Sequence, residues 1–166
     1  MKKPDAMQPA QSAHGLLHSK FAPPVSGRYL VPRARLNAWM ASAERAKVVL
    51  VWAPAGFGKT NLMAQWLAHL REQEKPTAWL TLDEADNAPG RFFSYLIAAI
   101  CKADPSLDRG DKDAGPLEGA GFPMGPILTR LEGRAASADP ITLFLDEFET
   151  LKSGEVLGAI QYFLLH

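Results

Sequence analysis

Cysteine is almost absent from this chain of 166 residues, with Cys101 as its sole example. One cysteine excludes an intramolecular disulfide and a cysteine-rich metal site, and none of the four histidines stands at ligand spacing from it. Net charge is absent as well, because 18 Lys and Arg balance 18 Asp and Glu. We therefore expect a reducing, cytoplasmic setting and a fold that depends on its hydrophobic core.

Long hydrophobic runs are also missing. No apolar stretch approaches the ~18 residues of a membrane-spanning helix, and the charged residues 1–5 are not followed by the apolar region of a signal peptide. The composition, 47% hydrophobic and 22% charged, is that of a globular protein. We expect a soluble chain of one domain, with no membrane partner and no internal repeats.

The zero net charge hides an uneven distribution. Residues 1–60 carry nine Lys or Arg and two Asp or Glu, whereas residues 61–166 carry nine and sixteen. The basic residues are scattered among prolines and apolar residues and form neither a basic helix nor an aromatic and basic strand pattern. We therefore do not expect this chain itself to contact DNA, and the positive part is expected to face an anionic ligand or the acidic half.

Apolar periodicity predicts an alternation of strands and helices after a flexible leader over residues 1–20 and an extended arm over 21–28. Loop composition predicts a mobile surface loop over 104–121. Strands are expected at 47–53, 77–82 and 141–145, and helices at 33–43, from about 59 to Pro76, at about 89–101, at about 124–134 and from the cap Ser153 onward. This order predicts an α/β sandwich with a mostly parallel sheet.

A glycine-rich segment follows the first predicted strand. It reads Ala53-Pro54-Ala55-Gly56-Phe57-Gly58-Lys59-Thr60 and matches a phosphate-binding loop with alanine in the first glycine position. Its glycines allow backbone N–H groups to converge on phosphate oxygens, and the following helix presents its unpaired N-terminal donors to the same anion. We expect residues 55–61 to bind a nucleotide: Ala55, Gly56, Phe57, Gly58, Lys59, Thr60 and Asn61, with Lys59 bridging the β- and γ-phosphates and the Thr60 hydroxyl binding Mg²⁺.

Two acidic residues end the last predicted strand. Asp146 follows the apolar run 141–145, so its carboxylate is expected at the carboxyl edge of the sheet, where ligands collect in such folds. There it would hold Mg²⁺ through water, and Glu147 would orient or deprotonate the attacking water. The aromatic residues Trp79, Phe92, Phe93 and Tyr95 are expected to pack in the interior, and the acidic residues Asp83, Glu84 and Asp86 to form a solvated turn.

Taken together, these motifs resemble the MalT-like subgroup of LuxR-type regulators, which are signal-transduction ATPases of the STAND class. The resemblance rests on the loop 54–61, on the segments 79–87 and 91–96, on Asp146-Glu147 and on an opening signature at 20–24 and 31–36. It implies a P-loop NTPase-type three-layer sandwich and an ATP-dependent switch, weakly hydrolysing, that self-associates when ATP replaces ADP. It also implies DNA binding only through a C-terminal domain, and contacts of Val31 and Arg33 with the base or ribose of the nucleotide.

Two departures from the family pattern bear on the site. Relatives have Asp-Asp-x-His where this chain has Asp146-Glu147-Phe148-Glu149, which leaves the role of the second acid and of Glu149 open. The strand that in this class lies between the first and third strands has no counterpart here. We therefore expect residues 21–166 to form a partial, truncated P-loop NTPase domain, with apolar flanks exposed at a gap in the sheet.

Two other readings stay open. A stand-alone P-loop ATPase or small kinase would need an acceptor pocket and lid arginines, and the loop 104–121 offers only Arg109. A truncated fragment without function would show no stabilisation by Mg-ATP. The sequence identifies neither the inducer nor the promoter nor the oligomeric state.

Overall fold

The computed structural model describes residues 16–24, 34–42, 46–108, 129, 131–134 and 139–165. The α-helices that it describes in full are α1 (Ala34–Ser42), α2 (Lys59–Glu72), α3 (Pro89–Ala103) and α5 (Gly154–Leu165). The strands are β1 (Thr77–Thr81) and β2 (Thr142–Asp146). Short 3-10 helices are η1 (His18–Phe21), η2 (Glu84–Asn87), η3 (Pro105–Leu107) and η4 (Phe148–Thr150).

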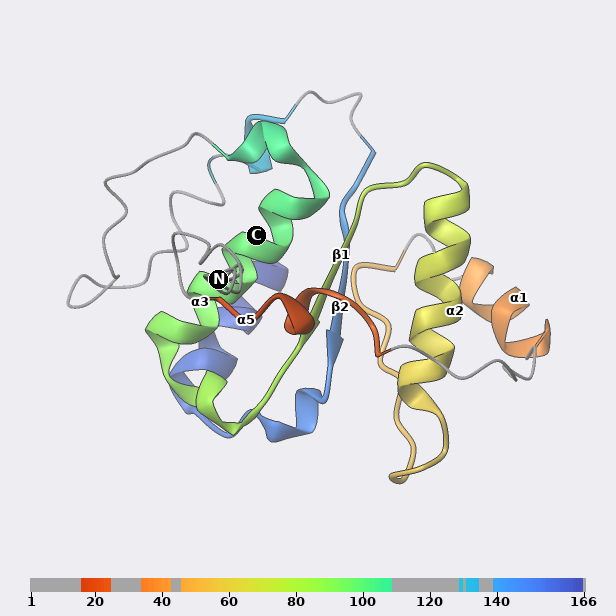
Figure 1. Ribbon diagram of the computed structural model, residues 1–166, viewed down its shortest axis with the longest axis horizontal. Helices are drawn as coiled ribbons and strands as arrows, with labels where there is room; N and C mark the ends of the chain where they lie inside the picture. Colours follow the sequence, from red (N-terminus) through yellow and green to blue (C-terminus); the bar gives the residue numbers. More distant parts are fainter. Residues whose placement is uncertain are drawn as a thin grey trace, which may run out of the picture.

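The two strands form a parallel sheet with helices on both faces. Their register pairs Thr77 with Thr142 and Thr81 with Asp146, so both strands end at the same edge. Figure 1 shows α2 on one side of the strands and α3 with α5 on the other. The α/β class and the parallel pairing are therefore confirmed, while a larger sheet is not seen among the described residues.

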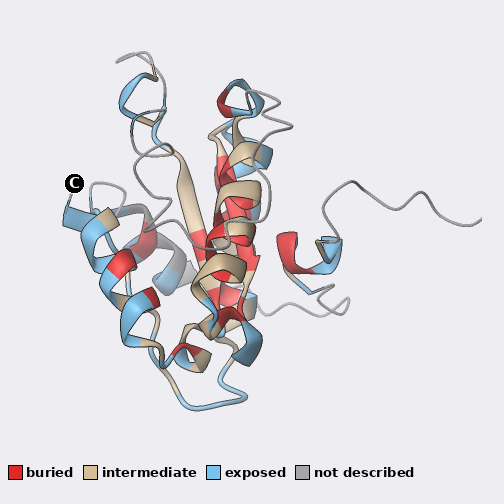
Figure 2. Ribbon diagram, turned by 90° about the vertical axis from the view of Figure 1, so that its left-hand side faces the viewer, coloured by how far each residue is buried: buried red, intermediate tan, exposed pale blue. Residues whose placement is uncertain are grey.

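Side chains on successive strand positions enter different cores because they point to opposite faces of the sheet. Ala78 and Leu80 of β1 join the larger core with α3 and α5, whereas Trp79 joins α2 on the other side. Trp79 stacks on Phe144 of β2 at 5.7 Å between ring centroids. Figure 2 shows that buried residues lie along the strands and on the helix faces turned toward them. This two-sided burial explains the nearly continuous apolar sequence of both strands.

Helix α3 is the main support of the larger core. Proline at its start suits the first helical turn, and Asp104 ends it in an extended conformation because Pro105 follows. Phe92, Leu96 and Ile100 recur at helical spacing and are buried, as are Phe93 and Tyr95. The expectation that these aromatic residues pack in the interior is confirmed.

The first predicted strand, 47–53, is not a strand in the structure. Residues 46–54 run without regular secondary structure, and no described strand pairs with them. Leu50 and Trp52 are 74% and 86% exposed, so the expected cover on both faces is wrong. A chain that pairs with no neighbouring strand has no ladder to hold it as a strand, and Leu50 and Trp52 therefore stay exposed.

Other predicted elements are confirmed with small shifts, including the cap of the last helix, where the Val156 N–H donates to Ser153 Oγ at 3.4 Å. The leader is not supported at residues 16–20, which contain most of η1 and a buried Lys20, and residues 1–15 lie outside the described part. Most of the predicted loop 104–121 and helix 124–134 also lies outside it.

None of the described helices has the length and apolarity needed to cross a membrane.

Candidate functional site

A cavity of about 620 Å³ opens at the carboxyl edge of the sheet. Its volume lies in the range of small-molecule and cofactor pockets. Three parts of the chain meet there: the glycine-rich loop with the start of α2, the ends of β1 and β2 with η4, and the segment around η1. The lining residues are Ser19, Ala22, Pro24, Pro54, Ala55, Gly56, Gly58, Lys59, Thr60, Asn61, Thr81, Asp146, Glu147 and Glu149.

The glycine-rich loop has the backbone conformation that only glycine adopts readily. Gly56 and Gly58 have φ angles of 82° and 79°, in the left-handed region. No side chain caps the N-terminus of α2, which begins at Lys59 directly after Gly58. The first backbone N–H groups of a helix have no partner within it and carry partial positive charge. The loop therefore presents an uncapped helix N-terminus to the cavity, as anion binding requires.

Lys59 brings a positive charge to the same place. Its Nζ donates to the Ala53 carbonyl oxygen at 3.0 Å and lies 3.1 Å from Glu149 Oε1. The pKa of the Glu149 carboxyl is lowered, first by a hydrogen bond from its own backbone N–H and then by the one from Lys59. The ammonium is thus positioned at the cavity wall by one carbonyl and one carboxylate.

Asp146 lies beside the start of α2. The Thr60 hydroxyl donates to Asp146 Oδ1 at 2.9 Å, joining residues that are 86 positions apart in the chain. Asp146 is buried at the last position of β2, opposite Thr81. The structure thus brings together the two residues predicted to hold a metal ion.

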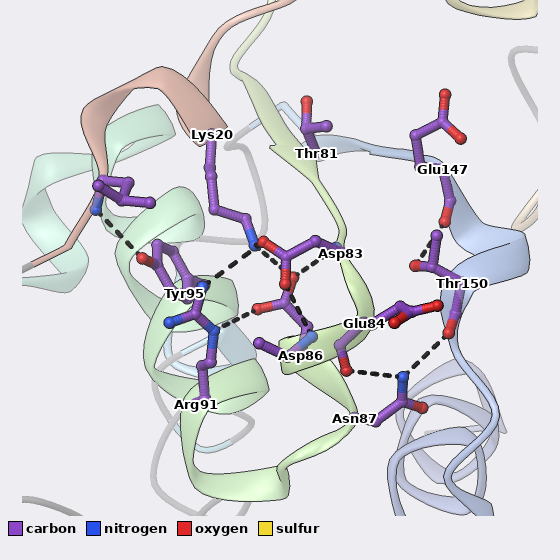
Figure 3. Close-up of polar contacts among 12 residues, drawn as sticks. Lys20, Thr81, Asp83, Glu84, Asp86, Asn87, Arg91, Tyr95, Glu147 and Thr150 are labelled. Carbon is purple, nitrogen blue, oxygen red and sulfur yellow. Dashed lines mark hydrogen bonds and ion pairs between the residues drawn. The ribbon is translucent and has the colours of Figure 1, made fainter.

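Glu147 follows Asp146 with a φ of 57°, an uncommon conformation for a residue other than glycine. Its side chain is exposed and lines the cavity, and Figure 3 shows it near Thr81 at the strand ends. Backbone outliers of this kind cluster at functional sites. No group of three acidic, histidine or cysteine side chains suited to a metal occurs among the described residues. Thr60 and Asp146 can hold Mg²⁺ only with further ligands, as is usual for this ion with phosphates.

Lys20, from the segment predicted as a leader, is at the centre of a buried ion-pair network (Figure 3). Its Nζ pairs with Asp86 and lies 2.8 Å from Asp83 Oδ2. Asp86 is completely buried and also accepts from Arg91 Nε at 3.1 Å. The Lys20 and Arg91 cations lie over the Tyr95 ring, at 4.7 and 5.0 Å from its centroid. The network fastens the segment around η1, which lines the cavity, to the end of β1 and to α3.

The expectation of a solvated acidic turn is therefore wrong for Asp86 and incomplete for Asp83. Asp83 caps η2 by accepting from the Ala85 N–H at 2.9 Å, and the Asp86 carboxylate accepts from the Asp83 N–H. The hydrogen bond from Lys20 is the main cause of a lowered pKa at the Asp83 carboxyl. Glu84 is exposed and the Asp83 side chain is 48% exposed, whereas Asp86 is buried. One signal for this network was present in the sequence, the opening signature at 20–24, but nothing there indicated a partner for Lys20.

Asn87 connects the acidic turn to the end of β2. Its amide nitrogen donates to the Thr150 carbonyl oxygen at 2.9 Å, and its side-chain oxygen accepts from the N–H groups of Lys152 and Ser153 at 2.6 and 2.8 Å. These bonds fix η4, and with it Glu149, relative to β1.

The remaining predicted site residues are distributed as follows. Ala55 and Asn61 line the cavity, whereas Phe57 is 63% exposed and lines a neighbouring apolar pocket beside α1. Val31 and Arg33 lie outside the described residues. Sequence reasoning missed the wall formed by Ser19, Ala22 and Pro24, and the contact of Glu149 with Lys59.

Comparison with known proteins agrees with the resemblance read from the motifs. The chain is 35% identical over 151 residues to the HTH-type transcriptional regulator MalT of Cronobacter sakazakii. It is 31% identical over 159 residues to the MalT regulators of Klebsiella pneumoniae subsp. pneumoniae and of Yersinia pestis. Each match covers 91% of this chain but only 16% of the relative's length. No protein-family model matches the chain.

Proposed function

We propose that this chain is a nucleotide-binding module related to MalT-type regulators, and that its cavity binds Mg-ATP and Mg-ADP. The observation that carries the proposal is the hydrogen bond between Thr60 and Asp146, 2.9 Å long, beside an uncapped helix N-terminus. It brings a hydroxyl and a carboxylate, both oxygen ligands of the kind Mg²⁺ prefers, to the place where the loop amides face an anion.

The residues present fit such a ligand in charge and in size. The cavity is large enough for a nucleotide, and Gly56, Gly58 and the cationic Lys59 line it. Lys59 and the helix N-terminus both favour negative charge, while the carboxylate of Asp146 favours a cation next to it. A metal-bound phosphate requires hydrogen-bond donors for its oxygens and a carboxylate beside the metal ion, and this cavity has both.

Each residue then has a defined task in a phosphate-cleaving switch. The loop amides and Lys59 would bind and orient the phosphates, and Thr60 and Asp146 would hold Mg²⁺, which would neutralise phosphate charge. Glu147, exposed on the cavity wall, accepts a proton from the attacking water at its carboxylate. A three-layer P-loop sandwich completed by further strands is part of this proposal.

The wider role follows from the relatives. Since they are named as HTH-type transcriptional regulators, we propose that the nucleotide state of this module controls a regulator. DNA binding would then belong to a domain other than this one, and self-association to the whole protein, in the cytoplasm.

The test is titration calorimetry with Mg-ATP and Mg-ADP on the chain and on Lys59→Ala. We expect the wild-type chain to bind, and the variant to lose binding because it loses the cation at the cavity wall. A ligand at about 100 times its dissociation constant should also stabilise the wild-type protein by about 2.7 kcal/mol.

The matched control is Lys152→Ala, which removes an exposed ammonium outside the cavity. It should bind as the wild-type chain does. Unchanged affinity in Lys59→Ala, or no binding by the wild-type chain, would remove the phosphate site from this cavity.

A further inference from the structure

Glu149 is the residue of this cavity whose role the sequence left open. It stands three positions after Asp146, on η4, and its carboxylate lies 3.1 Å from Lys59 Nζ. The Lys59 side chain is 19% exposed, and that of Glu149 is 58% exposed. The cation is thus held in place, whereas the carboxylate that meets it stands at the surface and has room to move.

The backbone around Glu147 brings this carboxylate to Lys59. The left-handed conformation of Glu147 turns the chain sharply at the end of β2, and η4 follows at once. The Thr150 N–H and hydroxyl both donate to the Glu147 carbonyl oxygen, at 3.0 and 2.8 Å, which closes the turn. Asn87 holds the far end of η4. Glu149 therefore meets Lys59 because the turn is built that way, not because an exposed side chain happens to lie there.

A carboxylate and a phosphate compete for the same ammonium. Both are anions that accept charge-assisted hydrogen bonds, so the donor that serves one is not free for the other. A phosphate placed at Lys59 would also lie close to the negative charge of Glu149, and like charges repel. Because Glu149 is largely exposed, it can turn into water at modest cost.

From this geometry we infer that Glu149 acts as an internal anion on Lys59 that a phosphate must displace, and that it thereby sets the nucleotide affinity of the site. The inference rests on the proposed function and deepens it. It makes Glu149 a residue that weakens binding, in contrast to the other polar residues of the cavity. Removing its charge while keeping its shape should therefore tighten binding.

The experiment compares wild type, Glu149→Gln, Lys59→Met and the double variant by calorimetry with Mg-ATP and Mg-ADP. We expect Glu149→Gln to bind about three to five times more tightly at low salt, as the loss of a partly exposed ion pair implies. The gain should shrink at high salt, where exposed charges are screened. In the Lys59→Met background we expect no binding with or without the Glu149→Gln substitution, because the ammonium that both anions use is gone.

Glu72→Gln is the matched control, because it neutralises an exposed glutamate at the opposite end of α2. It should leave the affinity unchanged. Equal affinities of wild type and Glu149→Gln, with Lys59 still required, would overturn the role of Glu149 and leave the proposed function intact. Nucleotide binding by the double variant that is as tight as binding by Glu149→Gln would also overturn it, because the gain would then not act through Lys59. If neither wild type nor Glu149→Gln binds nucleotide, the proposed function itself fails, and the inference falls with it.

Discussion

Replacing Lys20 with methionine is expected to destabilise the protein, although this residue lies near the start of the chain. The Lys20 side chain is 7% exposed and pairs with two carboxylates, one of which, Asp86, is fully buried. Methionine keeps most of the apolar stem and removes only the charge, so the change isolates the ion pairs. It leaves the carboxylate of Asp86 in the interior without its closest cation.

The size of the effect follows from what remains around Asp86. Removing one partner of a buried ion pair costs about 3–5 kcal/mol when the other charge is left alone. Here Arg91 still donates at 3.1 Å and the Asp83 N–H at 2.8 Å, which offsets part of that loss. Loss of the cation over Tyr95 adds about 0.5–1 kcal/mol. We expect a net decrease of about 2–3 kcal/mol in the free energy of unfolding.

Urea denaturation followed by tryptophan fluorescence measures this change. With a slope of about 2 kcal/mol/M, the midpoint should fall by about 1–1.5 M. Lys152→Met, at an exposed site, should leave the midpoint unchanged. In a double-mutant cycle with Asp86→Asn, the two substitutions should couple by more than about 1 kcal/mol. A midpoint shift below about 0.3 M, or additive effects in the cycle, would refute the reasoning that this network fastens the segment around η1.

Two further predictions concern the supports of the site. Asn87→Ala removes the bonds that join η2 to η4 and should cost about 2 kcal/mol in urea denaturation; a loss below about 0.5 kcal/mol would show that η4 is held otherwise. The pKa of Asp83 is lowered by Lys20, so its carboxylate contributes stability above about pH 4 that is lost as the pH falls through the lowered value. Asp83→Asn should therefore flatten the decline of stability as the pH falls below about 4, and an equally steep decline would contradict this linkage.

The helices and the two buried strands were predictable because their signals are local. Periodic apolar residues define α3, and the continuous apolar runs define β1 and β2, as found. The glycine-rich loop was also readable, since Gly56 and Gly58 adopt the conformation for which glycine is needed. The position of Asp146 at the carboxyl edge followed from the rule that ligands collect where parallel strands end. Its meeting with Thr60 was expected from the loop motif and not from strand pairing, since 47–53 is not a strand.

The segment 47–53 shows where a local signal is insufficient. Its residues have the composition of a buried strand, but a strand also needs a neighbour to pair with, and no described strand pairs with it. Composition reports which residues prefer a strand, whereas pairing depends on which other segments are present. The exposed Leu50 and Trp52 result from that difference.

The sequence by itself therefore determined the order of the elements and the residues of the phosphate loop, because hydrophobic periodicity and glycine conformation act over a few neighbouring positions. Only the tertiary structure decided the partners of Lys20, which are 63 and 66 positions away, and the contact of Glu149 with Lys59. Charged residues such as Asp86 look alike in a sequence whether they face water or an opposite charge. Asp86 is buried where Lys20 and Arg91 lie beside it in the folded chain, whereas Glu84 of the same turn faces water.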